Sequence, residues 1–351
     1  MVLADRSGNG EPGAEVRNTM ETQEMAHIVH AMKISRVGPP DVLEWTQEEL
    51  PEPGPGEVRL RQEAVGVNYI DIYHRTGGYP LPLPSGIGVE GAGVIEAVGD
   101  GVTHVVPGDR AAYVGGPPGG YASTRNVPAA RVVKLPEGIS TELAASLIFK
   151  GLTVEYLIRR CHAVQPGDVV LLHAAAGGIG QIASQWLKQI GATVIGTVGS
   201  EEKAEQARSH GCEHTILYTR ENFVERVREI TEGRGVSVVY DSIGKDTFSG
   251  SLDCLQPRGL LVSFGTSSGP VPPFDLGQLG ARGSLFVTRP SIAHYTARRE
   301  ELEAGAAALF DMIHTGLITT PGATKYELRD AAQAHRDLEA RRTSGSLILM
   351  P

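Results

Sequence analysis

The sequence VVLLHAAAGGIGQIASQWL, residues 169–187, joins an apolar run to a cluster of small residues and then to a second apolar pattern. Val169 to Leu172 are typical of a buried parallel strand, and the apolar residues after Gly180 recur at helical spacing. Ala175, Gly177 and Gly180 occupy the three glycine positions of the dinucleotide-binding pattern GxGxxG, with alanine in place of the first glycine. The stretch therefore predicts a strand, a tight turn and a helix whose N-terminus faces phosphate groups.

The residues that follow extend this unit and bear on the choice of dinucleotide. Residues 192–198, ATVIGTV, predict a second strand, which completes a βαβ unit. Enzymes that prefer NAD carry an acidic residue near the end of this strand, but residues 198–200 are VGS. Lys203 comes shortly afterwards and suits a 2′-phosphate, so we expect NADPH rather than NADH. The alternative is that Lys203 is a solvated residue of the next helix.

Length and composition exclude several classes of protein. The 351 residues suggest about two domains, and the hydrophobic fraction of 41% allows a sizeable core. No apolar run is long enough to span a bilayer. The formal net charge of −9 argues against a nucleic-acid partner. Cys161, Cys212 and Cys254 share no CxxC spacing, so we expect neither a disulfide framework nor a zinc ribbon, and a reducing cytoplasm fits best.

Three regions follow one another along the chain. Residues 1–27 are rich in polar residues and lack an apolar segment, which predicts a disordered leader. Residues 28–150 predict short strands and glycine turns, the pattern of a barrel-like β domain, before a helical signal begins at Ser140. Residues 151–289 alternate strands with helices, which indicates a doubly wound parallel sheet. Residues 290–351 predict two more helices and a final strand, which we expect to complete the first domain.

The boundaries of the predicted elements in the alternating region are as follows. We expect strands at 169–172, 192–198, 214–218, 236–244, 259–265 and 284–289, and helices at 202–210, 221–229 and 245–255. In the last region we expect helices at 298–315 and 328–340 and a strand at 346–350.

Eight segments in order carry a resemblance that covers the chain from about residue 32 to its end. They are GVNYIDIYHRTGGYP, LPSGIGVEGAG, FKGLTVEYL, HAAAGGIGQIASQW, GTVGSEEKA, VVYDSIG, LVSFG and VTRPS. This set resembles the quinone oxidoreductase, or zeta-crystallin-like, family of the medium-chain dehydrogenase/reductases. The resemblance implies a GroES-like catalytic domain (28–150 and 290–351), a Rossmann domain (151–289), NADPH as cofactor and a homodimer.

The residues also bear on whether zinc is present. Zinc alcohol dehydrogenases of the same superfamily carry a cysteine ligand in the first domain and a Gly-His-Glu segment after it. The corresponding places here hold Asn68 and Gly88-Val89-Glu90. A catalytic zinc needs about three protein ligands, and asparagine and valine do not supply two of them. We therefore expect no metal. His74 with Glu90 is the other possible ligand pair, but a single loop histidine is more often structural.

Without a metal, the remaining chemistry is direct hydride transfer to an acceptor whose oxygen becomes negative. The resemblance implies that Asn68, Tyr73 and Arg289 lie where nicotinamide and substrate meet, with Tyr79 a weaker candidate. Asn68 and Tyr73 would donate hydrogen bonds to the oxyanion, and Arg289 would add a fixed charge. The structural alternatives are a packed Tyr73, a turn Asn68 and an interdomain Arg289.

For the cofactor, the resemblance adds a larger set. It comprises Tyr156, Gly178, Ile179, Gly199, Ser200, Lys203, Tyr218, Ser242, Phe264 and Arg341, beside Gly177 and Gly180 of the glycine turn. Tyr218 would cover the adenine, Lys203 and Arg341 would lie near the 2′-phosphate or pyrophosphate, and Phe264 near the nicotinamide. Lys150 and Thr153 would meet the nicotinamide ribose or amide, unless Thr153 only satisfies helix backbone groups.

Three functions fit these residues. The first is a zinc-independent NADPH:quinone oxidoreductase, by hydride or electron transfer to a small quinone. The second is an NADPH-dependent reductase of the C=C bond of 2-alkenals or enones, because both acceptors are conjugated. The third is a non-catalytic NADPH-binding protein, crystallin-like or RNA-binding, against which the acidic charge and the retained cleft residues weigh. Acceptor choice depends on cleft shape, which the sequence does not define.

The substitution Lys203→Ala tests the cofactor assignment. We expect it to weaken NADPH binding much more than NADH binding, because only NADPH carries the 2′-phosphate that the ammonium would contact. Titration of the purified variant and the parent protein with each cofactor measures this difference. An equal loss for both cofactors would contradict the 2′-phosphate argument.

Overall fold

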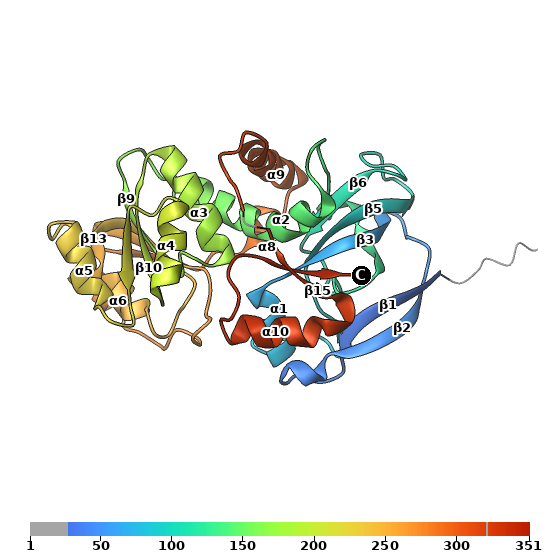
Figure 1. Cartoon of the computed structure of the whole chain (residues 1–351), viewed down its shortest axis with the longest axis horizontal. Helices are drawn as coiled ribbons and strands as arrows, with labels where there is room; N and C mark the ends of the chain where they lie inside the picture. Colours follow the sequence, from blue (N-terminus) through green and yellow to red (C-terminus); the bar gives the residue numbers. More distant parts are fainter. Residues whose placement is uncertain (1–26, 321) are drawn as a thin grey trace, which may run out of the picture.

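A parallel sheet of six strands forms one lobe of the molecule, and two β-sheets with the C-terminus form the other (Figure 1). The computed structural model describes residues 27–320 and 322–351. The predicted leader therefore lies outside the described residues except for His27, which begins the first strand. The predicted α/β class, with a Rossmann sheet and a GroES-like domain, is confirmed.

The parallel sheet has the strand order β11-β10-β9-β12-β13-β14. This is the 3-2-1-4-5-6 order of a dinucleotide-binding sheet, and its order reverses between β9 and β12. Its strands are β9 (Val169–Leu172), β10 (Thr193–Val198), β11 (His214–Leu217), β12 (Val236–Asp241), β13 (Leu255–Ser263) and β14 (Phe286–Thr288). Its helices are α3 (Gly178–Ile190), α4 (Glu201–Ser209), α5 (Phe223–Ile230), α6 (Phe248–Asp253) and α7 (Gly277–Ala281).

The other lobe is built on a seven-stranded sheet and a three-stranded sheet. Their strands are β1 (His27–Ile34), β2 (Glu44–Leu50), β3 (Glu57–Val67), β4 (Ser85–Gly86), β5 (Glu90–Val98), β6 (Arg110–Val114), β7 (Thr124–Pro128), β8 (Val132–Lys134), β15 (Thr324–Glu327) and β16 (Leu347–Met350). Strand β16 pairs antiparallel with β3, from Leu347 opposite Val67 to Leu349 opposite Val65. The end of the chain thus lies in the same sheet as residues 57–67.

Five further α-helices in the described residues are not part of the unit built on the parallel sheet. They are α1 (Tyr69–Thr76), α2 (Thr141–Tyr156), α8 (Ile292–Tyr295), α9 (Arg299–His314) and α10 (Ala331–Glu339). Helix α2 is almost wholly buried and contacts β3, α3 and α9, so it forms the junction of the two lobes. The expected boundary at residue 150 falls within this helix. No helix in residues 27–320 and 322–351 is long and apolar enough to cross a membrane.

The predicted secondary structure differs from the structure at α1 and α6, and α7 and α8 were not predicted. Residues 69–76 form a helix where the sequence pattern favoured only strands and turns. Asp71, at the third position of that helix, accepts a hydrogen bond from the backbone N–H of its N-cap, Asn68, and Gly77 ends the helix with a φ of 82°. The predicted helix 245–255 is restricted to Phe248–Asp253, because Leu255 already begins β13.

The glycine turn after β9 differs from the expected geometry at one position. Ala174, rather than Ala175, has the left-handed conformation, with a φ of 53°. Gly180 is required for close packing, since a Cβ there would lie 2.5 Å from the carbonyl oxygens of both Ala174 and Ala175. The turn and the first turn of α3 are therefore packed backbone against backbone.

We expect Gly180→Ala to lower the free energy of unfolding by roughly 1–3 kcal/mol, because the methyl group must displace the turn. Urea denaturation of the full chain measures the change. Gly280→Ala is the matched control: Gly280 lies in helix α7 and a Cβ there meets no atom within 4 Å. The control should be neutral or stabilising by up to about 1 kcal/mol. Equal stability of Gly180→Ala and the parent protein would contradict the packing argument.

Candidate active site

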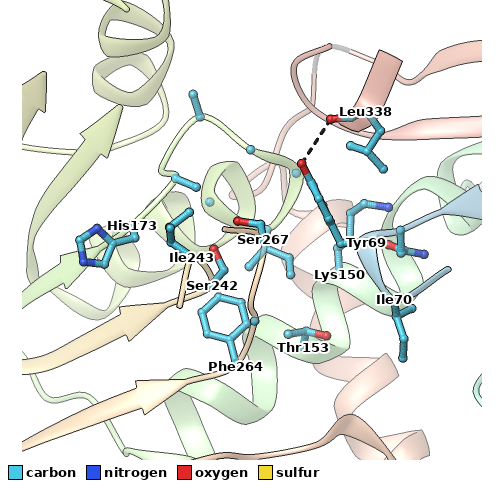
Figure 2. Close-up of a pocket in the computed structure, with 18 of the residues that line it drawn as sticks. Tyr69, Ile70, Lys150, Thr153, His173, Ser242, Ile243, Phe264, Ser267 and Leu338 are labelled. Atoms are coloured by element: carbon cyan, nitrogen blue, oxygen red, sulfur yellow. Dashed lines mark hydrogen bonds between the residues drawn. The ribbon is translucent and has the colours of Figure 1, made fainter. Parts of the chain in front are cut away.

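A cavity of about 740 Å³ opens at the ends of the parallel strands and extends to α1 and α2 in the other lobe (Figure 2). This volume is in the usual range for cofactor and ligand sites. All of the predicted site residues line it except Ser200. Ser200 instead caps α4, where its Oγ accepts the backbone N–H of Lys203 at 3.3 Å. The topology thus gathers residues from 68 to 341 around one space.

One end of the cavity can bind phosphate groups. Gly177 is the N-cap of α3, so the backbone N–H groups of Gly178, Ile179 and Gly180 have no acceptor within the helix. Lys203, on α4, lies near Arg341, which follows α10: the ammonium donates to the Arg341 carbonyl oxygen at 3.3 Å. Two residues from different lobes, each with a cationic side chain, therefore lie in contact at the cavity wall.

The surroundings of Lys203 fit a 2′-phosphorylated nucleotide. Glu201 and Glu202 precede Lys203 on α4, but neither lines the cavity. The ring of Tyr218 lies against Gly199, where a Cβ would come within 2.7 Å of the Tyr218 hydroxyl oxygen. Gly199 therefore leaves room for a flat, half-exposed aromatic ring at this end of the cavity. These residues fit NADPH: Lys203 and Arg341 could hold its 2′-phosphate, and the N-terminus of α3 its pyrophosphate.

The other end of the cavity presents hydrogen-bond donors. The Tyr73 hydroxyl accepts the backbone N–H of Thr266 at 3.1 Å, and the Tyr79 hydroxyl accepts a guanidinium N–H of Arg289 at 3.0 Å. Each phenol oxygen thus receives a hydrogen bond, and its own proton has no acceptor in the described part of the chain. Preorganised donors of this kind stabilise negative charge that develops on an oxygen.

Arg289 is held in place by backbone oxygens. Its Nη1 donates to the carbonyl oxygens of Ser263 at 3.2 Å and Gly265 at 3.1 Å, and its Nη2 donates to Tyr79. The guanidinium therefore joins the end of β13 to the loop after α1. These bonds agree with the alternative in which Arg289 is an interdomain contact. Its guanidinium also lines the cavity.

Asn68 and Lys150 share one buried carboxylate. The Asn68 amide donates to Glu90 Oε1 at 2.6 Å, and the Lys150 ammonium lies 3.6 Å from the same oxygen. The backbone N–H of Phe149 donates to the other oxygen, Glu90 Oε2, at 2.8 Å. Burial raises the pKa of Glu90, while Lys150 and these hydrogen bonds oppose the rise. Glu90 orients both side chains, and the second N–H of Asn68 stays available to a ligand.

Of the aromatic and hydroxyl residues between the two ends of the cavity, some face the cavity and others also serve the packing of α2. Phe264 and Ser242 follow β13 and β12 and face the cavity from the ends of these strands (Figure 2). The Thr153 hydroxyl donates to the Phe149 carbonyl oxygen at 2.8 Å. This bond is the alternative in which Thr153 satisfies a backbone group of its own helix. Tyr156 is nearly buried and stacks on Tyr295, with ring centroids 4.5 Å apart. Thr153 and Tyr156 thus also serve the packing of α2.

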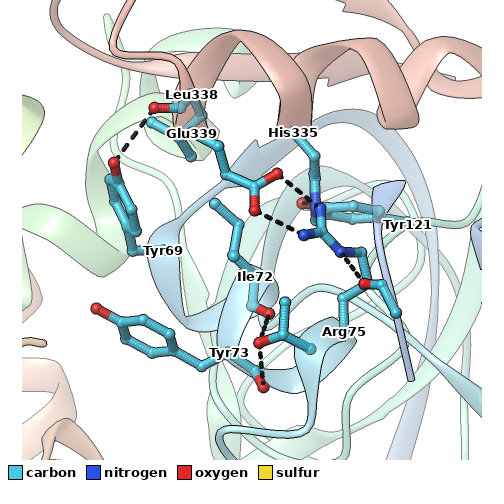
Figure 3. A network of polar contacts seen from close by, with 10 residues as sticks. Tyr69, Ile72, Tyr73, Arg75, Tyr121, His335, Leu338 and Glu339 are labelled. Carbon is cyan, nitrogen blue, oxygen red and sulfur yellow. Dashed lines mark hydrogen bonds and ion pairs between the residues drawn. The ribbon is translucent and has the colours of Figure 1, made fainter. Parts of the chain in front are cut away.

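A buried polar network holds α1 against α10 (Figure 3). Arg75 is 1% exposed and donates to both oxygens of Glu339, at 2.7 and 3.1 Å, and to Nδ1 of His335 at 3.0 Å. His335 is thus protonated at Nε2, which donates to the Tyr121 hydroxyl, and burial with the Arg75 charge lowers its pKa to about 3. The Tyr121 hydroxyl donates to Asp71 Oδ2 at 3.0 Å.

This network positions both ends of the cavity. Asn68, Tyr69 and Tyr73 belong to the turn and helix that Arg75 anchors. On the other side of the contact, the Leu338 carbonyl oxygen accepts the Tyr69 hydroxyl at 3.2 Å, and Arg341 follows three residues later. No motif in the sequence points to Arg75, Tyr121, His335 or Glu339, so these functional residues were not predicted. An Asn–x–x–Asp cap before Gly77 is the signal that would have revealed α1.

The chain matches two protein families. Residues 54–137 match the alcohol dehydrogenase GroES-like domain, and residues 178–310 match the zinc-binding dehydrogenase family. A quinone oxidoreductase of Pseudomonas aeruginosa is 50% identical over 321 residues, which are 91% of this chain and 99% of that protein. The chain belongs to the quinone oxidoreductase family.

Two further similarities describe the range of this quinone oxidoreductase family. The crystal structure of the Escherichia coli quinone oxidoreductase complexed with NADPH matches with a TM-score of 0.90 and 47% identity, covering 92% of this chain and all of that one. A 2-haloacrylate reductase of Burkholderia sp. is 47% identical, over 92% of this chain and 99% of that protein. In the present chain, the two residues considered as a metal-ligand pair have other contacts. Glu90 binds Asn68 and Lys150, and His74 packs edge-on against Tyr79.

Asp71 provides a pH-dependent test of the buried network. Its Oδ1 is buried without a partner among the described residues, and burial raises the pKa of its carboxyl from 3.8 to about 7. The folded protein therefore retains this proton where the unfolded chain has lost it. We expect the free energy of unfolding to fall as pH rises from about 4 to about 7, by about 4 kcal/mol for this group.

Asp71→Asn should remove that part of the pH dependence, because the amide oxygen can still accept the bonds from Asn68 and Tyr121. Urea unfolding between pH 4.5 and 8 measures both profiles. Asp100→Asn, at an exposed carboxylate, is the control and should keep the parent slope. If Asp71→Asn kept the parent slope as well, Asp71 would titrate normally in the folded protein.

Proposed function

We propose that this protein is a zinc-independent, NADPH-dependent quinone oxidoreductase that reduces small quinones. The observation that carries the proposal is the arrangement of one cavity with two cations, Lys203 and Arg341, at one end and hydroxyl donors of Tyr73 and Tyr79 at the other. Family membership and the NADPH-bound relative support the same activity.

Bound NADPH would supply the hydride from its nicotinamide. The chain's own residues then have separate tasks. The phosphates would be bound by Lys203, Arg341 and the N-terminus of α3. Phe264 and Gly265 line the region where the nicotinamide ring would lie. Tyr73, Tyr79 and the free N–H of Asn68 donate to the acceptor oxygen that becomes negative. Glu90 and Arg289 keep these donors in place, and the arrangement uses no metal ligand.

A second candidate is the reduction of an activated C=C bond. The Burkholderia relative is named a 2-haloacrylate reductase, and it spans nearly the same length of this chain. The donors that would stabilise a reduced quinone oxygen would equally stabilise the carbonyl or carboxylate oxygen of a conjugated acceptor. The cavity geometry serves both reactions, so acceptor turnover decides between them.

We further propose a homodimer in the cytoplasm. Strand β14 is at the edge of the parallel sheet, and Phe286 on it is 60% exposed, while Leu276 nearby in the chain is 72% exposed. An exposed apolar edge favours pairing with a second copy. Sedimentation should give twice the chain mass of 37.3 kDa.

The cytoplasm is proposed from the cysteines. Cys161, Cys212 and Cys254 are free thiols, which suits a reducing compartment.

Steady-state oxidation of NADPH and NADH tests the activity. The acceptors are 1,4-benzoquinone, 9,10-phenanthrenequinone, a 2-haloacrylate, an enone and a 2-alkenal, each with and without a chelator. We expect quinone turnover with NADPH that the chelator does not change. Preference for the acrylate, enone or alkenal would favour the C=C reductase. Inhibition reversed by zinc would contradict the metal-free mechanism, and no oxidation despite NADPH binding would favour a non-catalytic protein.

Tyr73→Phe tests the donor role. We expect kcat/KM for the quinone to fall by about 10²-fold, because the ring stays in place while one donor to the acceptor oxygen is lost. The KM for NADPH should change little. Tyr326→Phe is the control, since the Tyr326 hydroxyl donates to Asp337 outside the cavity. Unchanged turnover by Tyr73→Phe would show that this hydroxyl does not contact the acceptor.

A further inference from the structure

His173 follows β9 at the carboxyl end of the parallel sheet and lines the cavity, although it is only 2% exposed (Figure 2). Both ring nitrogens lie within hydrogen-bond distance of a hydroxyl group. Nδ1 is 2.9 Å from Thr197 Oγ1 on β10, and Nε2 is 3.0 Å from Ser251 Oγ on α6. The ring also packs edge-on against Phe223 of α5, with centroids 5.1 Å apart. Three elements of the sheet lobe therefore fix the imidazole.

Ser251 links His173 to a buried carboxylate at the end of β12. The Ser251 hydroxyl donates to Asp241 Oδ2 at 3.0 Å, and Asp241 is fully buried. A hydroxyl carries one proton, so Ser251 accepts at its other contact, and Nε2 of His173 is the donor there. Nδ1 then carries no proton and accepts the Thr197 hydroxyl. Burial lowers the pKa of His173, against the opposing effect of the Asp241 charge, which agrees with a neutral ring.

Asp241 also holds the loop that follows it, residues 242–247. Its Oδ1 accepts the backbone N–H groups of Ile243 at 2.8 Å and Gly244 at 3.0 Å. The Thr247 hydroxyl lies 2.9 Å from Oδ1 and 2.8 Å from Oδ2 of the same carboxylate. Ile243 and Thr247 line the cavity. The buried carboxylate thus sets the course of this loop along the cavity wall.

The first loop packs on a second loop, residues 264–269 after β13. The Ser268 backbone N–H donates to the Ile243 carbonyl oxygen at 2.9 Å, so the loops are joined main chain to main chain. In the second loop, the Thr266 backbone N–H donates to the Tyr73 hydroxyl at 3.1 Å. Asp241 is therefore connected, through two loops, to a phenol group that would donate to the acceptor.

We propose that His173 and Ser251 are positioning residues for the nicotinamide end of the cofactor site. They bind Asp241 on the side away from its loop bonds, and the carboxylate then holds residues 242–247 and, through them, residues 264–269. The inference rests on the proposed function and adds two residues that act through others. A small shift of a positioned group is enough to lower catalysis, so the loss of one such bond has a measurable effect.

Three variants cut or keep the link to Asp241. Ser251→Ala removes the hydroxyl group. His173→Asn keeps an acceptor near the Nδ1 position but no donor near the Nε2 position, whereas His173→Gln keeps a donor near the Nε2 position. Each full-length protein is titrated with NADPH and with 2′,5′-ADP, which lacks the nicotinamide half and would contact Lys203 and Tyr218 at the other end of the cavity.

We expect the Kd for NADPH to rise by about tenfold in Ser251→Ala and His173→Asn, and much less in His173→Gln. The Kd for 2′,5′-ADP should stay within about twofold in all three, because the link to Asp241 serves the opposite end of the cavity. With 1,4-benzoquinone, kcat/KM should fall by about tenfold or more in the first two variants.

Ser237→Ala is the matched control. Ser237 is on β12, as Asp241 is, but near the start of the strand, where its hydroxyl donates to the Val169 carbonyl oxygen at 3.1 Å. This variant should bind both ligands as the parent protein does. Circular dichroism establishes that each variant is folded, and the use of two positions, 173 and 251, keeps the test from depending on one variant.

Two results would overturn the inference. In one, folded Ser251→Ala and His173→Asn bind NADPH as tightly as the parent protein. In the other, they lose NADPH and 2′,5′-ADP equally, which would show that the network supports the whole sheet rather than the loops. A parent protein that binds NADPH but reduces no quinone would contradict the proposed function instead, and the two ligand titrations would still decide the positioning role.

Discussion

The pairing of β16 with β3 is the contact on which the active site depends. The chain leaves the first lobe through α2, builds the parallel sheet and returns so that Leu347 lies opposite Val67. Asn68 follows Val67 directly, and Arg341 and Gly345 precede Leu347 by a few residues. The return also places Gly345 beside Gly177 in a parallel β-bridge. One strand pair thus brings the cleft donors, the glycine turn and the C-terminal cation to a common cavity.

Buried charge at the junction is balanced locally. Glu90, Lys150 and Asn68 form one group, and Arg75, Glu339, His335, Tyr121 and Asp71 form another between α1 and α10. Removing one partner from such a group leaves a desolvated charge, which costs far more than an exposed ion pair contributes. Helix α1 is therefore held at its N-cap and along its length, which suits a helix whose N-cap Asn68 and second-turn Tyr73 line the cavity.

The alternating region was predicted well because its signals are local. Strand β9 begins and ends where the apolar run does, and α4 and α5 lie within about two residues of their predicted limits. Helix α6 is shorter than predicted, and α7 was not predicted. Helix α1 was missed because three of its four buried residues, Asp71, His74 and Arg75, are polar or charged, so no apolar stripe marks its buried face. Its cap also depends on Asn68 and Asp71 together. Ser200 was assigned to the cofactor, but its hydroxyl caps α4, because a serine before a helix has a closer partner in the backbone.

The sequence by itself determined the βαβ unit and showed that residues 198–200, at the end of β10, include no carboxylate while Lys203 follows, since these features involve residues close together in the chain. Only the tertiary structure decided that Lys203 meets Arg341, that Glu90 binds both Asn68 and Lys150, and that Ser251 joins His173 to Asp241. The physical reason is separation along the chain. Periodicity and caps reflect interactions between near neighbours, whereas a cavity depends on how distant segments pack and on which polar groups must find partners once water is excluded.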